Sequence, residues 1–101
     1  MNETITAPRM TKELKVARPK LHKVILLNDP YTPRNFVVRV LQAEFGMGES
    51  RAQGVMLTAH RLGSCVVAVF TKEVAEEKAT RATDRARKEG RPLTFTTEPE
   101  E

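Results

Sequence analysis

The chain has 101 residues, 40% hydrophobic and 30% charged, with a formal net charge of +4, the composition of one small globular domain. Its longest apolar run, residues 65–70, is far too short to cross a membrane, and residues 1–10 lack the order of a secretory signal. The one cysteine excludes an internal disulfide, which fits a reducing compartment. We therefore expect a cytoplasmic protein, and nothing in the sequence requires more than a monomer.

Two regions are expected, a flexible arm over residues 1–20 and a folded domain over residues 21–101. The arm has no hydrophobic periodicity, and Pro19 marks its end. The domain begins with a short strand over residues 23–28, whose apolar run KVILL is bounded by turn residues. Pro30 ends this strand because a proline cannot donate to a strand ladder.

Two helices are expected next. The first starts with Thr32 as its N-cap and Pro33 as its first helical residue, and it ends at Gly46. The second covers residues 49–61 and stops at Gly63. Each helix carries apolar residues at helical spacing, which predicts one buried face.

A strand, a helix and a last strand complete the domain. Residues 65–70 (CVVAVF) are the clearest strand, and Thr71 caps a helix over residues 72–89 with a narrow stripe of alanines. Residues 93–97 (LTFTT) form the last strand. The order β-α-α-β-α-β predicts an α+β fold, a three-stranded antiparallel sheet with three helices on one face and the other face solvated.

The sequence contains no recognisable catalytic or metal centre. Cys65 starts an apolar strand, where a buried inert thiol is the usual outcome. His22 and His60 are isolated and complete no metal-ligand set. The glycines form no phosphate-binding loop. We therefore expect neither an enzyme nor a cofactor. By itself, His60 is explained as a histidine that complements the C-terminal dipole of its helix.

Four motifs together resemble the ClpS family of bacterial adaptor proteins. LNDPYTPRNFV (27–37) resembles the family's signature turn, and VMLTAHRLG (55–63) resembles its Met-Leu-x-x-His helix. VVAVFTKEVAEEKA (66–79) and RPLTFTTE (91–98) resemble a strand with its following helix and the closing strand. The match covers about residues 20–99 in order. It implies the same fold and a non-enzymatic adaptor that delivers N-degron substrates to the ClpA-type unfoldase of the ClpAP protease.

The resemblance also implies which residues act. The family holds a first side chain of Phe, Tyr, Trp or Leu in a deep apolar pocket and the free α-amine at its rim. By position, the amine would be held by Asn28, Asp29, Pro30 and His60. The pocket wall would come from Leu26, Thr32, Arg34, Val37, Met56, Ala59 and Leu93. The contacts with the N-terminal domain of the unfoldase would come from Glu73 and Lys78. The arm would match the segment that enters the unfoldase during delivery.

Two of these positions depart from the family's usual pattern. Pro30 stands where a second aspartate normally helps to hold the amine, and Arg34 stands where a methionine normally lies at the pocket entrance. A guanidinium can stack on an aromatic ring, but it also repels a nearby ammonium. We therefore expect a weaker or narrower variant that favours aromatic first residues over Leu.

Two other functions stay open. One is docking on the unfoldase without recognition of substrate termini, because Pro30 and Arg34 change the expected pocket. The other is a ribosome- or nucleic-acid-associated α/β domain, which the positive net charge suggests. Residues 1–20, however, hold five basic and two acidic side chains, while residues 21–101 hold twelve and eleven. A nearly balanced folded part argues against a nucleic-acid surface.

Overall fold

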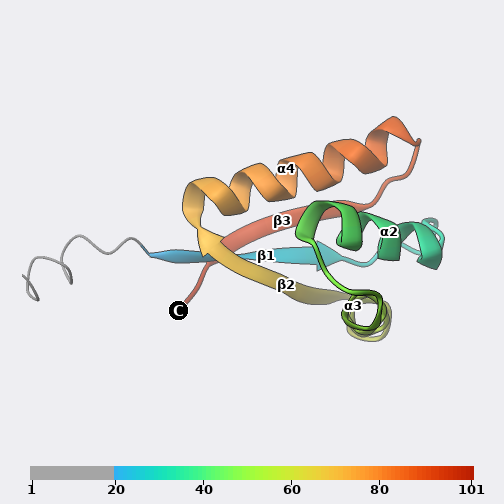
Figure 1. Cartoon of the computed structure of the whole chain (residues 1–101), viewed down its shortest axis with the longest axis horizontal. Helices are drawn as coiled ribbons and strands as arrows, with labels where there is room; N and C mark the ends of the chain where they lie inside the picture. Colours follow the sequence, from blue (N-terminus) through green and yellow to red (C-terminus); the bar gives the residue numbers. More distant parts are fainter. Residues whose placement is uncertain (1–19) are drawn as a thin grey trace, which may run out of the picture.

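The computed structural model describes residues 20–101, in which three helices pack on a three-stranded antiparallel sheet (Figure 1). The elements are β1 (Leu21–Leu27), α2 (Arg34–Phe45), α3 (Glu49–Leu62), β2 (Ser64–Thr71), α4 (Lys72–Lys88) and β3 (Thr94–Pro99). This confirms the predicted order and the α+β class, with element ends shifted by one or two residues. Apart from Lys20, the expected arm lies outside the described residues.

The start of α2 differs from the prediction. Pro33, not Thr32, is the N-cap, and its carbonyl accepts from the backbone N–H groups of Phe36 (3.1 Å) and Val37 (3.2 Å). Thr32 is buried, and its hydroxyl donates to Oδ2 of Asp29 at 2.6 Å. The prediction of a Thr32 cap was wrong because the hydroxyl closes the preceding turn instead of the helix. Thr71 is the N-cap of α4 as predicted, although its side chain accepts no capping hydrogen bond from the backbone of α4.

The strand order is β2-β1-β3, so β1 is the central strand. Val24 and Leu26 of β1 point into the core and are almost fully buried, while the alternating odd-numbered positions face away from the helices. A register shift opposite Val24 leaves Val67 as an extra residue in β2, and this residue is also buried in the core. Because of this bulge, Val67 enters the core, whereas the neighbouring Val66 stays exposed on the opposite face of the sheet.

The helices close the core from one side of the sheet. In α4 the buried positions are alanines, which keep the helix close to β1 and β3. Larger side chains fill the centre, including Leu41 of α2, Leu26 of β1 and Leu93, which directly precedes β3. The rings of Phe45 and Phe95 lie 5.6 Å apart between centroids. None of the described helices is long and apolar enough to span a bilayer.

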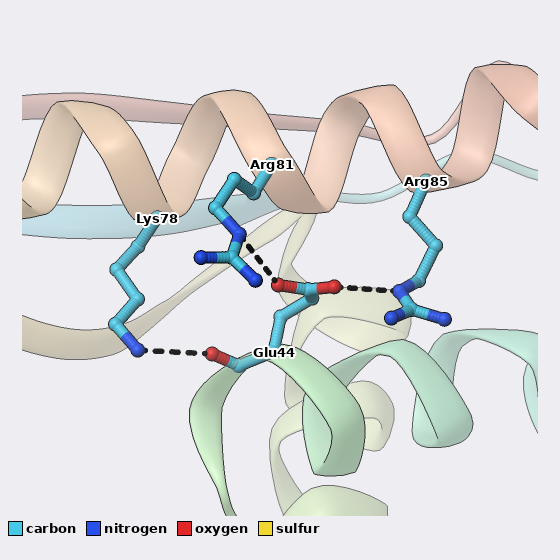
Figure 2. Close-up of polar contacts among 4 residues, drawn as sticks. All are labelled: Glu44, Lys78, Arg81 and Arg85. Carbon is cyan, nitrogen blue, oxygen red and sulfur yellow. Dashed lines mark hydrogen bonds and ion pairs between the residues drawn. The ribbon is translucent and has the colours of Figure 1, made fainter.

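One buried carboxylate connects α2 to α4 (Figure 2). Glu44, near the end of α2, is only 8% exposed. Nε of Arg85 donates to its Oε2 at 2.6 Å, and Nε of Arg81 lies 3.5 Å from its Oε1. Nζ of Lys78 donates to the main-chain carbonyl of Glu44 at 3.3 Å. Three consecutive turns of α4 therefore contact one residue of α2, and the buried charge is compensated.

The elements that form the candidate site meet where β1 ends. Figure 1 shows α2 and α3 beside the end of β1, while α4 runs along the sheet. The N–H of Asn28, just after β1, donates to the carbonyl of Gly63 at 3.0 Å. Gly63 ends α3 with a left-handed conformation (φ 94°), which favours glycine. The β1–α2 connection is thus held against the turn between α3 and β2.

The Glu44 contacts predict an asymmetric response to mutation. We expect R85A to lower the free energy of unfolding by about 1–3 kcal/mol, because it leaves a buried carboxylate with one distant partner. R81A should cost less, about 0–1 kcal/mol, because Arg81 is more exposed and its ion pair is longer. Urea denaturation followed by circular dichroism measures both values. Equal losses in the two variants would contradict the unequal roles assigned here.

Candidate functional site

A cavity of about 310 Å³ lies between the end of β1, α2 and α3. Its volume is at the small end for ligand pockets, which suits one amino-acid side chain better than a drug-sized molecule. Thirteen residues line it: Leu26, Leu27, Asn28, Asp29, Pro30, Thr32, Pro33, Arg34, Val37, Met56, Ala59, His60 and Leu93. All eleven residues predicted for amine binding or for the pocket wall are therefore brought together.

The lining residues fall into a buried group and an exposed group. The buried part comprises five side chains of the hydrophobic core, Leu26, Val37, Met56, Ala59 and Leu93, together with the buried polar residue Thr32. The exposed part includes Asn28, Pro30, Arg34 and His60, and Asp29 is half-buried. The cavity thus combines an apolar interior with polar groups at its entrance. Such a site can enclose an apolar side chain and hold a polar group outside it.

Residues 29–32 form a tight turn at the entrance. The N–H of Thr32 donates to the carbonyl of Asp29 at 3.3 Å, which is the hydrogen bond of a β-turn. Pro30 occupies the second position of this turn, where its fixed φ is favourable, and Asp29 occupies the first. Pro30 therefore contributes rigidity rather than charge. The Thr32 hydroxyl occupies one oxygen of the Asp29 carboxylate, and a carboxylate has further lone pairs for another donor.

Arg34 and His60 meet across the entrance. Nη2 of Arg34, in the first turn of α2, donates to Nε2 of His60, in the last turn of α3, at 3.0 Å. A guanidinium can only donate, so the Nε2 atom is the acceptor and His60 is neutral in this arrangement. The helix-dipole explanation of His60 is consistent with its place in α3, but the side chain also has a specific partner at the cavity.

Sequence reasoning missed two of the lining residues, Leu27 and Pro33. Both lie inside the turn motif of residues 27–37, so their position in the motif was a usable signal. Glu73 and Lys78 do not line the cavity. Glu73 is exposed in the first turn of α4, whereas Lys78 is half-buried and lies 5.9 Å from the centre of the Phe70 ring. Any role of these two residues belongs to a different surface.

The site offers recognition groups and no reactive centre. Among residues 20–101, no cluster of three or more His, Cys, Asp or Glu side chains could hold a metal ion. Cys65 lies in β2 outside the cavity lining, and desolvation by burial raises the pKa of its thiol above the ordinary value. What the entrance supplies is hydrogen-bond acceptors, the side-chain carbonyl of Asn28 and the ring nitrogen of His60.

Comparison with known proteins gives concordant matches. Residues 17–96 match the family model described as "ATP-dependent Clp protease adaptor protein ClpS". The chain is 64% identical over 101 residues to the ATP-dependent Clp protease adapter protein ClpS 1 of Bradyrhizobium diazoefficiens, covering 100% of both chains. It is 70% identical over 89 residues to ClpS 1 of Rhodopseudomonas palustris, covering 88% of this chain and 86% of the relative.

A solved structure is similar over most of this chain. The structure of Agrobacterium tumefaciens ClpS2 bound to L-phenylalaninamide superposes with a TM-score of 0.81 at 59% sequence identity. The match covers 82% of this chain and 100% of that chain. The similarity therefore extends over the three helices and the sheet, including the elements that form the cavity.

The environment of Cys65 predicts low thiol reactivity. A raised pKa lowers the thiolate fraction at any given pH, and the thiolate is the reacting species. At pH 8 we expect iodoacetamide to alkylate Cys65 in the native protein several-fold more slowly than in urea-unfolded protein. Mass spectrometry of timed samples gives both rates. Faster alkylation in the native state would contradict the assigned desolvation.

Proposed function

This chain belongs to the ClpS family of adaptor proteins for the ATP-dependent Clp protease, and we propose that its cavity binds the first residue of substrate proteins. As a ClpS protein it is a non-catalytic adaptor. The observation that carries the proposal is the cavity itself, in which all eleven predicted residues combine an apolar interior with acceptors at the entrance. Binding of L-phenylalaninamide by the A. tumefaciens relative supports it, because that ligand has an aromatic side chain and a free amine.

The entrance groups suit a protein N-terminus. An α-amine has an ordinary pKa of about 7.7–8.0 and is mostly cationic at neutral pH. The side-chain carbonyl of Asn28 and the neutral ring of His60 can each accept one of its protons, and the Asp29 carboxylate adds negative charge nearby. Acetylation removes the cation and adds bulk. The site therefore discriminates a free chain terminus from an internal residue.

Affinity from one residue requires a pre-formed pocket. Burial of an aromatic side chain contributes about 1.5–3 kcal/mol, and a hydrogen bond to a charged group contributes about 1.5–3 kcal/mol. Micromolar binding needs about 8 kcal/mol, so several such terms must act without a large ordering cost. The buried wall residues and the Asp29–Thr32 turn are already in place, which keeps that cost low.

Arg34 supports the narrower selectivity expected from the sequence. Its guanidinium holds Nε2 of His60, the ring nitrogen that otherwise could accept from a substrate amine. The amine must displace this bond, and two cations at the entrance repel each other. An aromatic first residue offers a ring on which the displaced guanidinium can stack, whereas Leu does not. We therefore propose preference for Phe, Tyr and Trp over Leu.

Delivery is assigned to a surface away from the cavity. We propose that Glu73 and Lys78 of α4 contact the N-terminal domain of a ClpA-type unfoldase, as the resemblance implies. Glu73 is exposed, but Lys78 already contacts the Glu44 carbonyl and the Phe70 ring. Lys78 would then serve both the α2–α4 contact and the partner. In the simplest arrangement of these surfaces, the protein acts in the cytoplasm as a monomer, and each monomer delivers its substrate through one contact with the unfoldase.

A panel of fluorescent peptides that differ only in their first residue tests terminus recognition. We expect fluorescence polarisation to rise on titration of this protein for Phe, but not for acetyl-Phe, Arg or Ala, because only Phe offers both a ring and a free amine. M56A should weaken Phe binding while leaving the fold intact, as judged by circular dichroism. Equal behaviour of Phe and Ala would support docking on the unfoldase without terminus recognition.

Exchange of Arg34 tests selectivity. We expect R34M to bind Phe peptides about five- to tenfold more tightly, because the amine no longer has to displace Arg34 from His60. This increase in affinity corresponds to the free energy of about one hydrogen bond. Leu peptides should gain more than Phe peptides, because they lose nothing when the stacking group is removed. R39M is the matched control, an exposed arginine of α2 outside the cavity lining. A Leu affinity equal to the Phe affinity in the unmutated protein would refute the proposed preference.

A further inference from the structure

The sheet carries an apolar surface on the face turned away from the helices. We call it the open-face stripe, and it consists of Leu21, Ile25, Leu27, Val66 and Val69. On β1 these positions alternate with the core residues Val24 and Leu26. On β2, Val66 pairs with Ile25, and Val69 pairs with Lys23, which shares their face. The register therefore places all five side chains on the same side of the sheet.

Burial separates the stripe from the core. Leu21, Leu27, Val66 and Val69 are 37–46% exposed. Ile25 is buried but lies outside the core cluster of the described chain, so its neighbours on the open face cover it. Isolated exposed aliphatic side chains are ordinary, whereas this row across two strands offers one continuous apolar surface on which a short apolar segment can pack.

The stripe is continuous with the cavity. Leu27 belongs to both, because it lines the cavity and ends the stripe. Leu27 pairs with Ser64, which makes Val66 its diagonal neighbour at about 7–8 Å. An extended peptide advances at most about 3.3–3.6 Å per residue. A chain that leaves the cavity past Leu27 therefore covers the distance from Leu27 to Val66 with two or three residues.

The size of the stripe indicates what kind of occupant it suits. A stable protein–protein interface buries about 800 Å² on each partner, far more than four partly exposed aliphatic side chains provide. A segment tethered by its first residue is different, since its effective concentration at the stripe is in the millimolar range. Weak apolar contacts are then sufficient to add affinity. The Lys23–Glu98 ion pair (3.6 Å) gives the stripe a polar border toward β3.

We propose that the open-face stripe binds apolar side chains at the second to fifth positions of the substrate whose first residue occupies the cavity. The proposal rests on the proposed function and extends it from one residue to a short apolar segment. Substrates with an aromatic first residue followed by aliphatic residues are thus the preferred class. The stripe adds a selection that the cavity cannot make, because the cavity encloses a single side chain.

Two fluorescent peptides test this, Phe-Leu-Gly-Val-Ser and Phe-Ser-Gly-Ser-Ser, each with the same labelled C-terminal extension. We expect the aliphatic peptide to bind about three- to tenfold more tightly, as burial of one or two partly exposed side chains provides. The double variant V66T/V69T should remove this advantage and leave the serine peptide unaffected. Threonine keeps the β-branched shape on the exposed strand, so β2 is retained.

The matched control is V74T, the same exchange at a similarly exposed valine of α4, away from the stripe. It should leave both affinities unchanged. Equal binding of the two peptides, or an advantage that survives V66T/V69T, would overturn the stripe while the cavity function stands. Failure of both peptides to bind would overturn the cavity function and this proposal with it. A concentration-dependent dimer in sedimentation that V66T/V69T abolishes would assign the stripe to a second copy instead.

Discussion

The contact between the buried Glu44 carboxylate and α4 is the interaction on which the rest of the arrangement depends (Figure 2). A carboxylate that is almost fully removed from water must be compensated by cations and donors, and Arg81 and Arg85 supply them from one helix face. This fixes the C-terminal end of α2 against α4. Because α2 also supplies Arg34 and Val37, its position determines one wall of the cavity.

The second constraint is the short connection between β1 and α2. The Asn28–Gly63 hydrogen bond and the Asp29–Thr32 turn leave this segment little freedom, and Pro30 removes more. A rigid entrance is what a site for one residue needs, because little binding energy is available to order it. The aspartate that the family usually carries at Pro30 is thus replaced by a residue that contributes to shape. Asn28, Asp29 and His60 remain as the hydrogen-bond acceptors at the cavity entrance.

The proposed functions use different parts of a small domain. The cavity lies at one end of the sheet, the exposed first turn of α4 follows β2, and the open-face stripe covers the side without helices. Under these proposals, a substrate in the cavity leaves the first turn of α4 accessible to a partner. The nearly balanced charge of residues 21–101 agrees with recognition by shape and apolar burial rather than by a basic field.

The sequence by itself determined the element order and the fold class, and through a family resemblance it also predicted eleven of the thirteen residues that line the cavity. Apolar periodicity, glycine stops and turn residues are local signals, so they predict the helices and strands. The turn motif at residues 27–37 is also local, because many of the predicted site residues lie within this one short segment. Sequence also predicted that Met56, His60 and Leu93 belong to the site, but only through resemblance to a family. Spacing alone left His60 as a residue complementing a helix dipole.

Only the tertiary structure decided the partners of these residues. Glu44 has no distinguishing local pattern, because its arginines are about forty residues away in sequence and meet it only after α4 packs on α2. The Arg34–His60 bond and the Asp29–Thr32 hydroxyl bond likewise depend on side-chain directions that a sequence does not specify. The bulge at Val67 decided which valines of β2 face the core and which remain exposed. Periodicity fixes local conformation, whereas long-range contacts choose among apolar or charged side chains of equal local preference.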